Sequence, residues 1–105
     1  MPFASPNERA IHFAKHGHKF GARSDIEYER LADAFMSGAM DADTWECVRP
    51  GRVNRVRFRT TNRHLGIACI HPAFIRTFYP VSAGHVAHYG GSAKYFAYEC
   101  GRAIV

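Results

Sequence analysis

The chain has 105 residues, of which 47% are hydrophobic and 13% aromatic, so the composition predicts one globular domain and excludes a disordered chain. No apolar run approaches the roughly 20 residues that a membrane-spanning helix needs. The formal charge is +5, and seven of the eleven arginines lie between Arg49 and Arg76, a cluster that favours a polyanionic partner over an ordinary solvated surface.

Two helices are predicted in the first third of the chain. Ser5 can cap a helix that runs roughly from Pro6 to His16, and Gly17 ends it. A second helix with the same kind of start begins at Asp25, and its apolar residues keep helical spacing until Gly38. We interpret its apolar stripe as core; the stripe consists of Tyr28, Leu31, Ala32, Phe35 and Met36.

The pattern changes to strands after an irregular stretch. Residues 38–51 are expected to form a loop that Trp45 anchors. Alternation then predicts a strand over Val53 to Thr60 with one arginine-lined face, formed by Arg55, Arg57 and Arg59, and an apolar face with Val56 and Phe58. Strands at Leu65 to Ile70 and Phe74 to Tyr79 follow after short turns, which predicts an antiparallel meander.

The last quarter of the chain gives weaker signals. Val81 to Ser92 is rich in Gly, Ser and His and is expected to be a loop. Lys94 to Val105 fits a fourth strand or a closing helix, and we favour the strand. The predicted class is therefore α+β, with two N-terminal helices packed on a three- to four-stranded antiparallel sheet.

The three cysteines are widely spaced and form no CxxC pair. Cys47, Cys69 and Cys100 fit neither a closed disulfide framework nor a zinc knuckle. We expect them to be buried, small apolar residues of a chain that folds in a reducing compartment.

His12 and His16 are four residues apart on the first helix, so both imidazoles face the same side. There is no HExxH pattern and no third ligand at a telling spacing, which argues against zinc. A solvated helix face is one interpretation. The neighbouring cations Lys15 and Lys19 favour another, in which the histidines transfer protons beside a bound phosphate.

The last predicted strand carries polar groups at alternating positions. Ile75, Thr77 and Tyr79 are expected on one face, with Arg76 and its apolar neighbours on the other. The Thr77 hydroxyl and the Tyr79 phenol can both donate to one phosphate. Threonine and tyrosine are also ordinary strand residues, so plain sheet surface is the alternative.

Two motifs carry a resemblance to a known family. HFAKHGHKFG at residues 12–21, followed by a capped helix, an arginine-rich strand and IRTFYP at residues 75–80, resembles the barnase–EndoU–colicin–RelE-like group of toxin ribonucleases. The likeness covers about residues 9–80. It implies two helices packed on an antiparallel sheet and metal-independent cleavage of RNA, often tRNA. It also implies a catalytic His16, with Thr77 and Tyr79 completing the site.

The physics of RNA cleavage agrees with this resemblance. The 2′-OH of RNA can attack the adjacent phosphorus, so a protein needs only proton transfer and charge stabilisation, without metal or organic cofactor. The candidate catalytic residues are His16, Thr77, Tyr79 and His12. The candidate phosphate-binding residues are Lys15, Lys19, Arg55, Arg57, Arg59 and Arg76.

Two other classes of function remain open. One is a non-catalytic nucleic-acid-binding module that uses the same arginine strand. The other is an adaptor whose basic face meets an acidic protein. The sequence lacks the exposed aromatic pair of an RNA-recognition motif and the basic second helix of a helix-turn-helix protein. These differences favour the ribonuclease.

The expected partners are RNA, with tRNA favoured, and an acidic immunity or antitoxin protein. No membrane association is expected. Met1 to Arg9 lacks the basic-then-apolar order of a signal peptide, so we expect delivery within a larger toxin or particle. The site of action would then be the cytoplasm of a target cell in bacterial competition.

Overall fold

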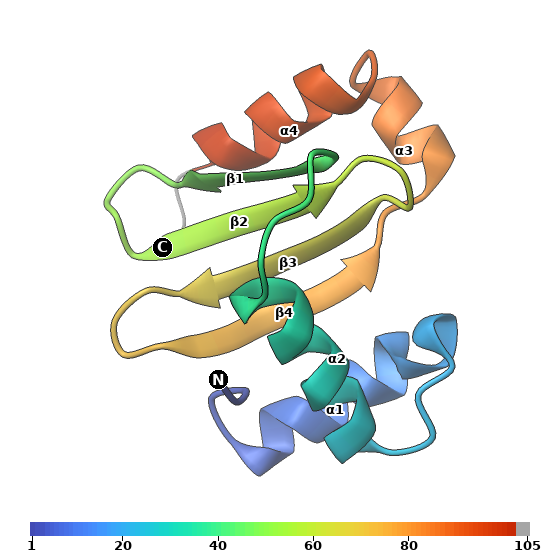
Figure 1. Cartoon of the computed structure of the whole chain (residues 1–105), viewed down its shortest axis with the longest axis vertical. Helices are drawn as coiled ribbons and strands as arrows, with labels where there is room; N and C mark the ends of the chain where they lie inside the picture. Colours follow the sequence, from blue (N-terminus) through green and yellow to red (C-terminus); the bar gives the residue numbers. More distant parts are fainter. Residues whose placement is uncertain (103–105) are drawn as a thin grey trace.

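The computed structural model describes residues 1–102, which form a four-stranded antiparallel sheet with helices on both sides (Figure 1). The α+β class predicted from the sequence is confirmed. None of the helices within residues 1–102 is long and apolar enough to cross a membrane. The elements in chain order are α1 (Pro6–His16), the short 3-10 helix η1 (Gly17–Phe20), α2 (Asp25–Ser37), β1 (Thr44–Val48), β2 (Asn54–Arg59), β3 (His64–Cys69), β4 (Phe74–Pro80), α3 (Ala83–His88) and α4 (Ser92–Gly101).

The two N-terminal helices begin as the sequence predicts. The Ser5 hydroxyl accepts a hydrogen bond of 3.1 Å from the backbone N–H of Glu8, and Ser24 caps α2 in the same way. Gly17 ends α1 but continues into η1, which Gly21 ends with a left-handed φ of 68°. This extra turn keeps Lys19 and Phe20 close to the end of α1.

The sheet is a meander in the order β1-β2-β3-β4. The predicted strands β2, β3 and β4 are confirmed, but the expected loop over residues 38–51 is wrong because it contains β1. Trp45 and Cys47 of β1 pair with Phe58 and Val56 of β2, and they pack on the same apolar cluster. One acidic residue between two apolar ones gave too short an alternation to reveal an edge strand.

Each face of the sheet has its own apolar core. The α4 face carries the first cluster, which α3 and α4 cover: Val56, Phe58, Leu65, Ile67, Val81, Val86 and Tyr95. The α2 face carries the second, which α1 and α2 cover: Phe3, Tyr28, Ala32, Ile75 and Phe78. On this face Gly66 permits close packing, because a Cβ there would lie 2.3 Å from the Met36 sulfur.

A β-bulge in β4 changes which side chains share a face. Ile67 pairs with Thr77, but Ala68 pairs with Ile75, so Arg76 is the extra residue. Ile75 therefore joins Phe78 in the cluster on the α2 face. The prediction that Ile75 shares a face with Thr77 and Tyr79 is wrong for this reason.

The C-terminal part of the described chain is helical. The loop expected over Val81 to Ser92 contains α3, and the strand favoured over Lys94 to Val105 is α4. Helical spacing brings Tyr95 and Glu99 to the same buried side of α4. Residues 103–105 of that prediction lie outside the described residues.

The expectation for the cysteines is wrong for two of the three. Cys47 of β1 and Cys100 of α4 form a disulfide with their Cα atoms 6.0 Å apart, while Cys69 is free and buried, as predicted. The spacing of 53 residues gave no local signal, because the pairing depends on α4 folding back over β1. The link holds the end of α4 against the sheet.

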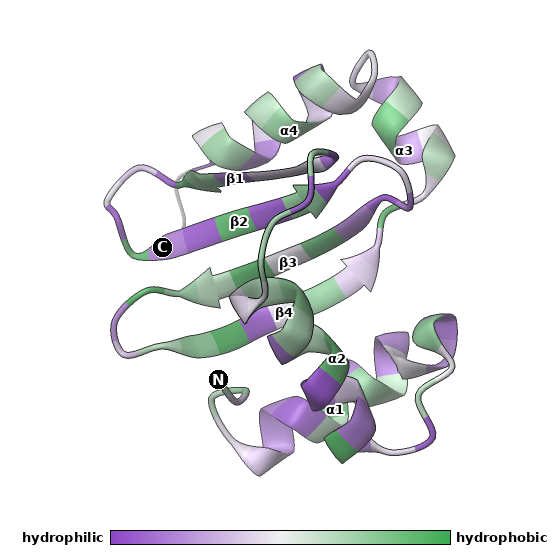
Figure 2. Cartoon of the chain, viewed as in Figure 1, coloured by the Kyte–Doolittle hydropathy of each residue, from purple (hydrophilic) through white to green (hydrophobic). Residues whose placement is uncertain are grey.

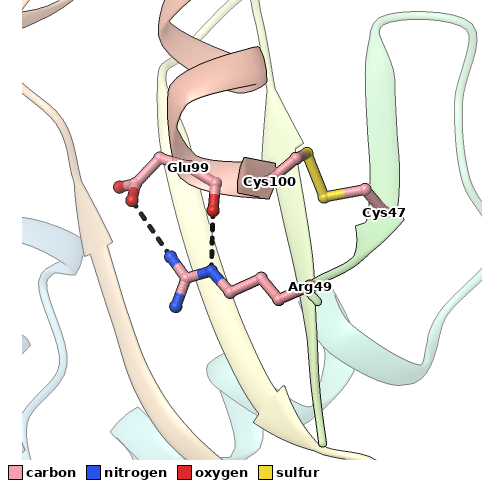
Figure 3. Close-up of a disulfide and its surroundings, with 4 residues drawn as sticks. All are labelled: Cys47, Arg49, Glu99 and Cys100. Carbon is pink, nitrogen blue, oxygen red and sulfur yellow. Dashed lines mark hydrogen bonds and ion pairs between the residues drawn. A yellow bond between two sulfur atoms is a disulfide. The ribbon is translucent and has the colours of Figure 1, made fainter. Parts of the chain in front are cut away.

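A buried ion pair lies beside the disulfide (Figure 3). Arg49 is 1% exposed and Glu99 is 2% exposed, so neither charge is hydrated. Arg49 donates to a Glu99 carboxylate oxygen at 3.0 Å and to the Glu99 backbone carbonyl at 2.7 Å. The Tyr95 hydroxyl donates to the second carboxylate oxygen at 2.6 Å. The carboxylate thus compensates a charge that would otherwise be costly to bury.

Candidate active site

The imidazole of His16, at the end of α1, lies against the ring of Tyr79 in β4. The two ring centres are 5.1 Å apart and the planes are inclined by 23°, so the rings stack. Phe13 of α1 packs against the apolar cluster on the α2 face, which fixes α1 on the β4 side of the sheet (Figure 1). The structure therefore brings together two of the predicted site residues that are 63 positions apart in the sequence.

Burial and neighbouring cations keep His16 in its neutral form. Burial is the largest cause that lowers the pKa of His16, to about 4, and the Lys19 ammonium is the next. Smaller contributions come from His12, Lys15 and His18. The Nδ1 atom of His16 has no hydrogen-bond partner among residues 1–102. A neutral imidazole can accept a proton, so at pH 7 His16 is in the protonation state that a general base requires.

His12, Lys15, His16 and Lys19 form what we call the helix-end group. The ring centre of His12 is 6.2 Å from that of His16, and the other side of the His12 ring stacks on Phe3. Burial lowers the pKa of His12 and the Glu8 carboxylate partly opposes this effect. Lys15 and Lys19 are exposed, and within residues 1–102 no carboxylate lies within 4 Å of either ammonium.

Thr77 and Arg76 take different positions on β4. Thr77 is half-buried and points to the same face as Tyr79, two residues along the strand. Arg76 lies in the bulge, where its Nε donates to the Asn54 side chain and its guanidinium stacks over the Phe74 ring at 5.0 Å. It therefore occupies the opposite end of β4 from Tyr79 and does not join the helix-end group.

The strand arginines Arg55, Arg57 and Arg59 share one face of β2, as the alternation predicts. Figure 2 shows this alternation as hydrophilic and hydrophobic residues that follow one another along β2. The guanidinium of each arginine nevertheless forms an ion pair with a carboxylate. Arg55 and Arg57 contact the same Glu46 carboxylate oxygen at 2.7 and 3.1 Å. Arg59 contacts the Asp43 carboxylate at 2.9 Å. The sequence does not show this, because both acids, Asp43 and Glu46, lie within residues 38–51, where the pattern predicts an irregular loop.

Arg57 has a structural role that the alternation of residues along β2 does not indicate. It is only 7% exposed, and one terminal nitrogen donates to the backbone carbonyls of Phe35 and Gly38 at 2.9 and 2.8 Å. These carbonyls belong to the end of α2, where the helix leaves acceptors without partners. Arg57 thus fixes α2 to the sheet, and its guanidinium is not available to a ligand.

The hydroxyl of Tyr79 points toward the network beneath α4. Burial is the main cause that raises the pKa of Tyr79, and the Glu99 carboxylate adds to it, while the Tyr95 hydroxyl acts in the opposite direction. The ring of Tyr79 thus supports His16 on one side while its hydroxyl contacts the interior. Tyr95 and Glu99 were not identified from the sequence as residues near the Tyr79 hydroxyl. Their spacing of four would have placed them on one side of a helix, had residues 94–101 been predicted as helical.

Comparison with known protein families, with curated proteins and with solved structures finds no match. Within residues 1–102, no group of three or more His, Cys, Asp or Glu side chains is arranged to hold a metal ion. The site itself offers a neutral imidazole, a stacked phenol ring and two exposed ammonium groups.

Proposed function

We propose that this protein is an endoribonuclease that cleaves RNA without a metal, with His16 as the proton-accepting group. The observation that carries the proposal is the contact between His16 and Tyr79, which fixes a neutral imidazole next to two exposed lysines. A fixed base beside cations is what attack by a 2′-OH on a phosphodiester requires.

The proposed reaction is an attack by the RNA on its own phosphodiester. The 2′-oxygen gives its proton to His16 and forms a bond to phosphorus, and the bond from phosphorus to the 5′-oxygen breaks. That oxygen takes a proton from water or from the Lys19 ammonium, and the products end in a 2′,3′-cyclic phosphate and a 5′-OH. Lys15 and Lys19 offset the charge that develops on the phosphate, and Thr77 offers a hydroxyl donor. Tyr79 positions the imidazole.

The pairing of the strand arginines bears on the alternative function. A non-catalytic binding module was expected to use Arg55, Arg57 and Arg59 for phosphate, but all three contact carboxylates. The cations without such contacts among residues 1–102 include Lys15 and Lys19, which flank a histidine. This distribution favours a ribonuclease over a module that only binds.

The resemblance to the barnase–EndoU–colicin–RelE-like toxin ribonucleases belongs to the same proposal. The motif residues His16, Thr77 and Tyr79 come from the two stretches that carry it. On this view tRNA is the favoured substrate, the chain reaches a target cell as part of a larger toxin, and an acidic immunity protein covers the helix-end group in the producing cell.

The test is cleavage of total tRNA by the purified protein in excess chelator, with analysis of the fragment ends. We expect 2′,3′-cyclic phosphate and 5′-OH ends, and no cleavage at a position that carries 2′-deoxyribose. His16→Ala should lower the rate at least about a hundredfold, the scale of a lost proton-transfer group. RNA binding should persist, because Lys15 and Lys19 remain.

His71→Ala is the matched control for this variant. His71 is exposed in the turn before β4, at the end of the strand away from Tyr79, so its loss should leave the rate unchanged. Activity that disappears in chelator and returns with one divalent ion would refute the metal-free mechanism. Binding of RNA with no cleavage of any RNA by the parent would support the binding module instead.

A further inference from the structure

A groove of about 450 Å³ opens on the α2 face where η1, α2 and the sheet meet. Aromatic side chains dominate its lining, which consists of Lys19, Phe20, Leu31, Phe35, His64 and Phe78. The rings of Phe20 and Phe78 stack with their centres 4.2 Å apart, and the His64 ring meets Phe20 edge-on at 4.9 Å. The groove therefore has a floor of fixed ring surfaces.

The lining residues are only partly covered by the fold. Leu31 on the rim is 38% exposed, and Phe20, Phe35 and His64 are half-buried, whereas Phe78 below them is 3% exposed. Apolar rings that reach the opening of a concave surface are typical of a ligand site.

The groove adjoins the candidate active site. Lys19 lines the groove, lies three residues after His16, and is the cation that contributes most to lowering the pKa of His16. Phe78 in the floor and Tyr79, on which His16 stacks, are neighbours at the same end of β4, with their side chains on opposite faces of the sheet. A ligand that joins a planar ring to a phosphate could thus place the ring in the groove and the phosphate between Lys19 and His16.

We infer that this groove binds the base of the nucleotide adjacent to the phosphate that is cleaved. The inference rests on the proposed function and extends it to the substrate: RNA with an unstacked base, as in a loop or single strand. Base–aromatic stacking supplies affinity for any base, and the Lys19 ammonium complements the linked phosphate.

One polar side chain in the lining can contact the edge of a base. Burial lowers the pKa of His64, and the nearby charges of Arg59 and Arg63 lower it further, so the ring is neutral at pH 7. A neutral imidazole has one donor nitrogen and one acceptor nitrogen. His64 can therefore complement a base edge in a way that the phenylalanines cannot.

The size of the groove favours a nucleotide over a peptide helix. A helix docked in a groove needs anchors spread over two turns, which form an elongated apolar surface. The lining here consists of six residues from η1, α2, β3 and β4, and only one of them is a cation. Its volume is within the range of small-ligand sites, about 300–1,000 Å³.

The experiment titrates the protein with the four nucleoside 3′-monophosphates, with ribose phosphate and with inorganic phosphate, by calorimetry and aromatic NMR. These ligands contain no bond that the proposed reaction cleaves. We expect at least one nucleotide to bind about tenfold more tightly than ribose phosphate, the scale of one base–aromatic contact, with shifts at Phe20, Phe35 and His64. Phe35→Leu should remove most of this difference, because it keeps an apolar side chain but loses the ring.

Leu31→Ala is a second variant that leaves the floor intact, and Ile26→Ala is the matched control. Ile26 is an exposed apolar residue of the same helix, 41% exposed and outside the groove lining. Equal affinity for nucleotides and ribose phosphate, or equal effects of Phe35→Leu and Ile26→Ala, would overturn the inference. Nucleotide binding in the groove without RNA cleavage would support a base-binding groove while refuting the ribonuclease and the role of the groove in cleavage. Cleavage without base binding would support the ribonuclease and overturn the groove as its base site.

Discussion

Two sets of basic side chains in this small protein have opposite surroundings. Arg49 and the strand arginines each contact a carboxylate, and two of them are almost fully buried. The lysines of the helix-end group are exposed, with no such contact among residues 1–102. The comparison shows that the density of arginine in a sequence does not locate an anion site, because the acids that fold against the arginines decide which charges remain available.

Arg49, the most buried member of the first set, should give the largest effect on stability through its pair with Glu99. Glu99→Ala removes the carboxylate that compensates Arg49, and breaking a buried pair in this way costs about 3–5 kcal/mol of the free energy of unfolding. Urea denaturation at pH 7 measures the loss. The comparison variant is Glu27→Ala, which removes an exposed contact with Arg23 and should cost less than about 1 kcal/mol. Equal losses of unfolding free energy in Glu99→Ala and Glu27→Ala would mean that another group compensates the charge of Arg49.

The sequence predicted the parts of this architecture that local spacing controls. Ser5 and Ser24 cap their helices because a cap needs only a hydroxyl three residues before an N–H. The alternation of Val56 and Phe58 with arginines revealed β2, because a strand buried on one face repeats every two residues. The juxtaposition of His16 and Tyr79 came from motif residues that lie 63 positions apart in the sequence.

The features that were missed depend on contacts between distant segments. The bulge at Arg76 reverses the face of Ile75 without any glycine or proline to mark it. Nothing in the sequence around Glu46 marks it as a partner of the arginines. Only the pairing of β1 with β2 brings it to Arg55 and Arg57. The disulfide and the groove arise in the same way, since each needs elements that are adjacent only after folding.

The helix-end group predicts an unusual pH dependence of cleavage. If neutral His16 is the base, a pKa of about 4 leaves it active throughout pH 5.5–7.5, and kcat/KM falls only as the pH drops through the value of the free protein. A histidine at its usual value near 6.5 would lose activity over that range. Lys19→Gln removes the main cationic cause, so the pKa should rise and the fall should move to higher pH.

Rates on one tRNA and an NMR titration of the His16 ring test this prediction together. Lys94→Gln is the control, because Lys94 lies on α4 and is not among the causes of the His16 shift. A parent whose activity halves near pH 6.5, or a Lys19→Gln profile that coincides with that of the parent, would show that the lysine does not control the base.

The smallest expected effect compares the two sets of basic side chains directly, through the salt dependence of RNA binding. Each phosphate contact contributes about 0.7 to the slope of log affinity against log salt for a single strand, because one condensed counterion is released. Lys19→Ala should therefore reduce the slope by about that amount. Arg59→Ala should change it much less, since Asp43 at 2.9 Å and Asp41 at 3.4 Å already neutralise the guanidinium. Fluorescence anisotropy with a 2′-O-methyl oligonucleotide, which the proposed reaction cannot cleave, gives both slopes over a range of salt concentrations. A larger change of the salt slope in Arg59→Ala than in Lys19→Ala would mean that RNA displaces the two aspartates. The strand arginines would then be the phosphate-binding surface, as the sequence predicts.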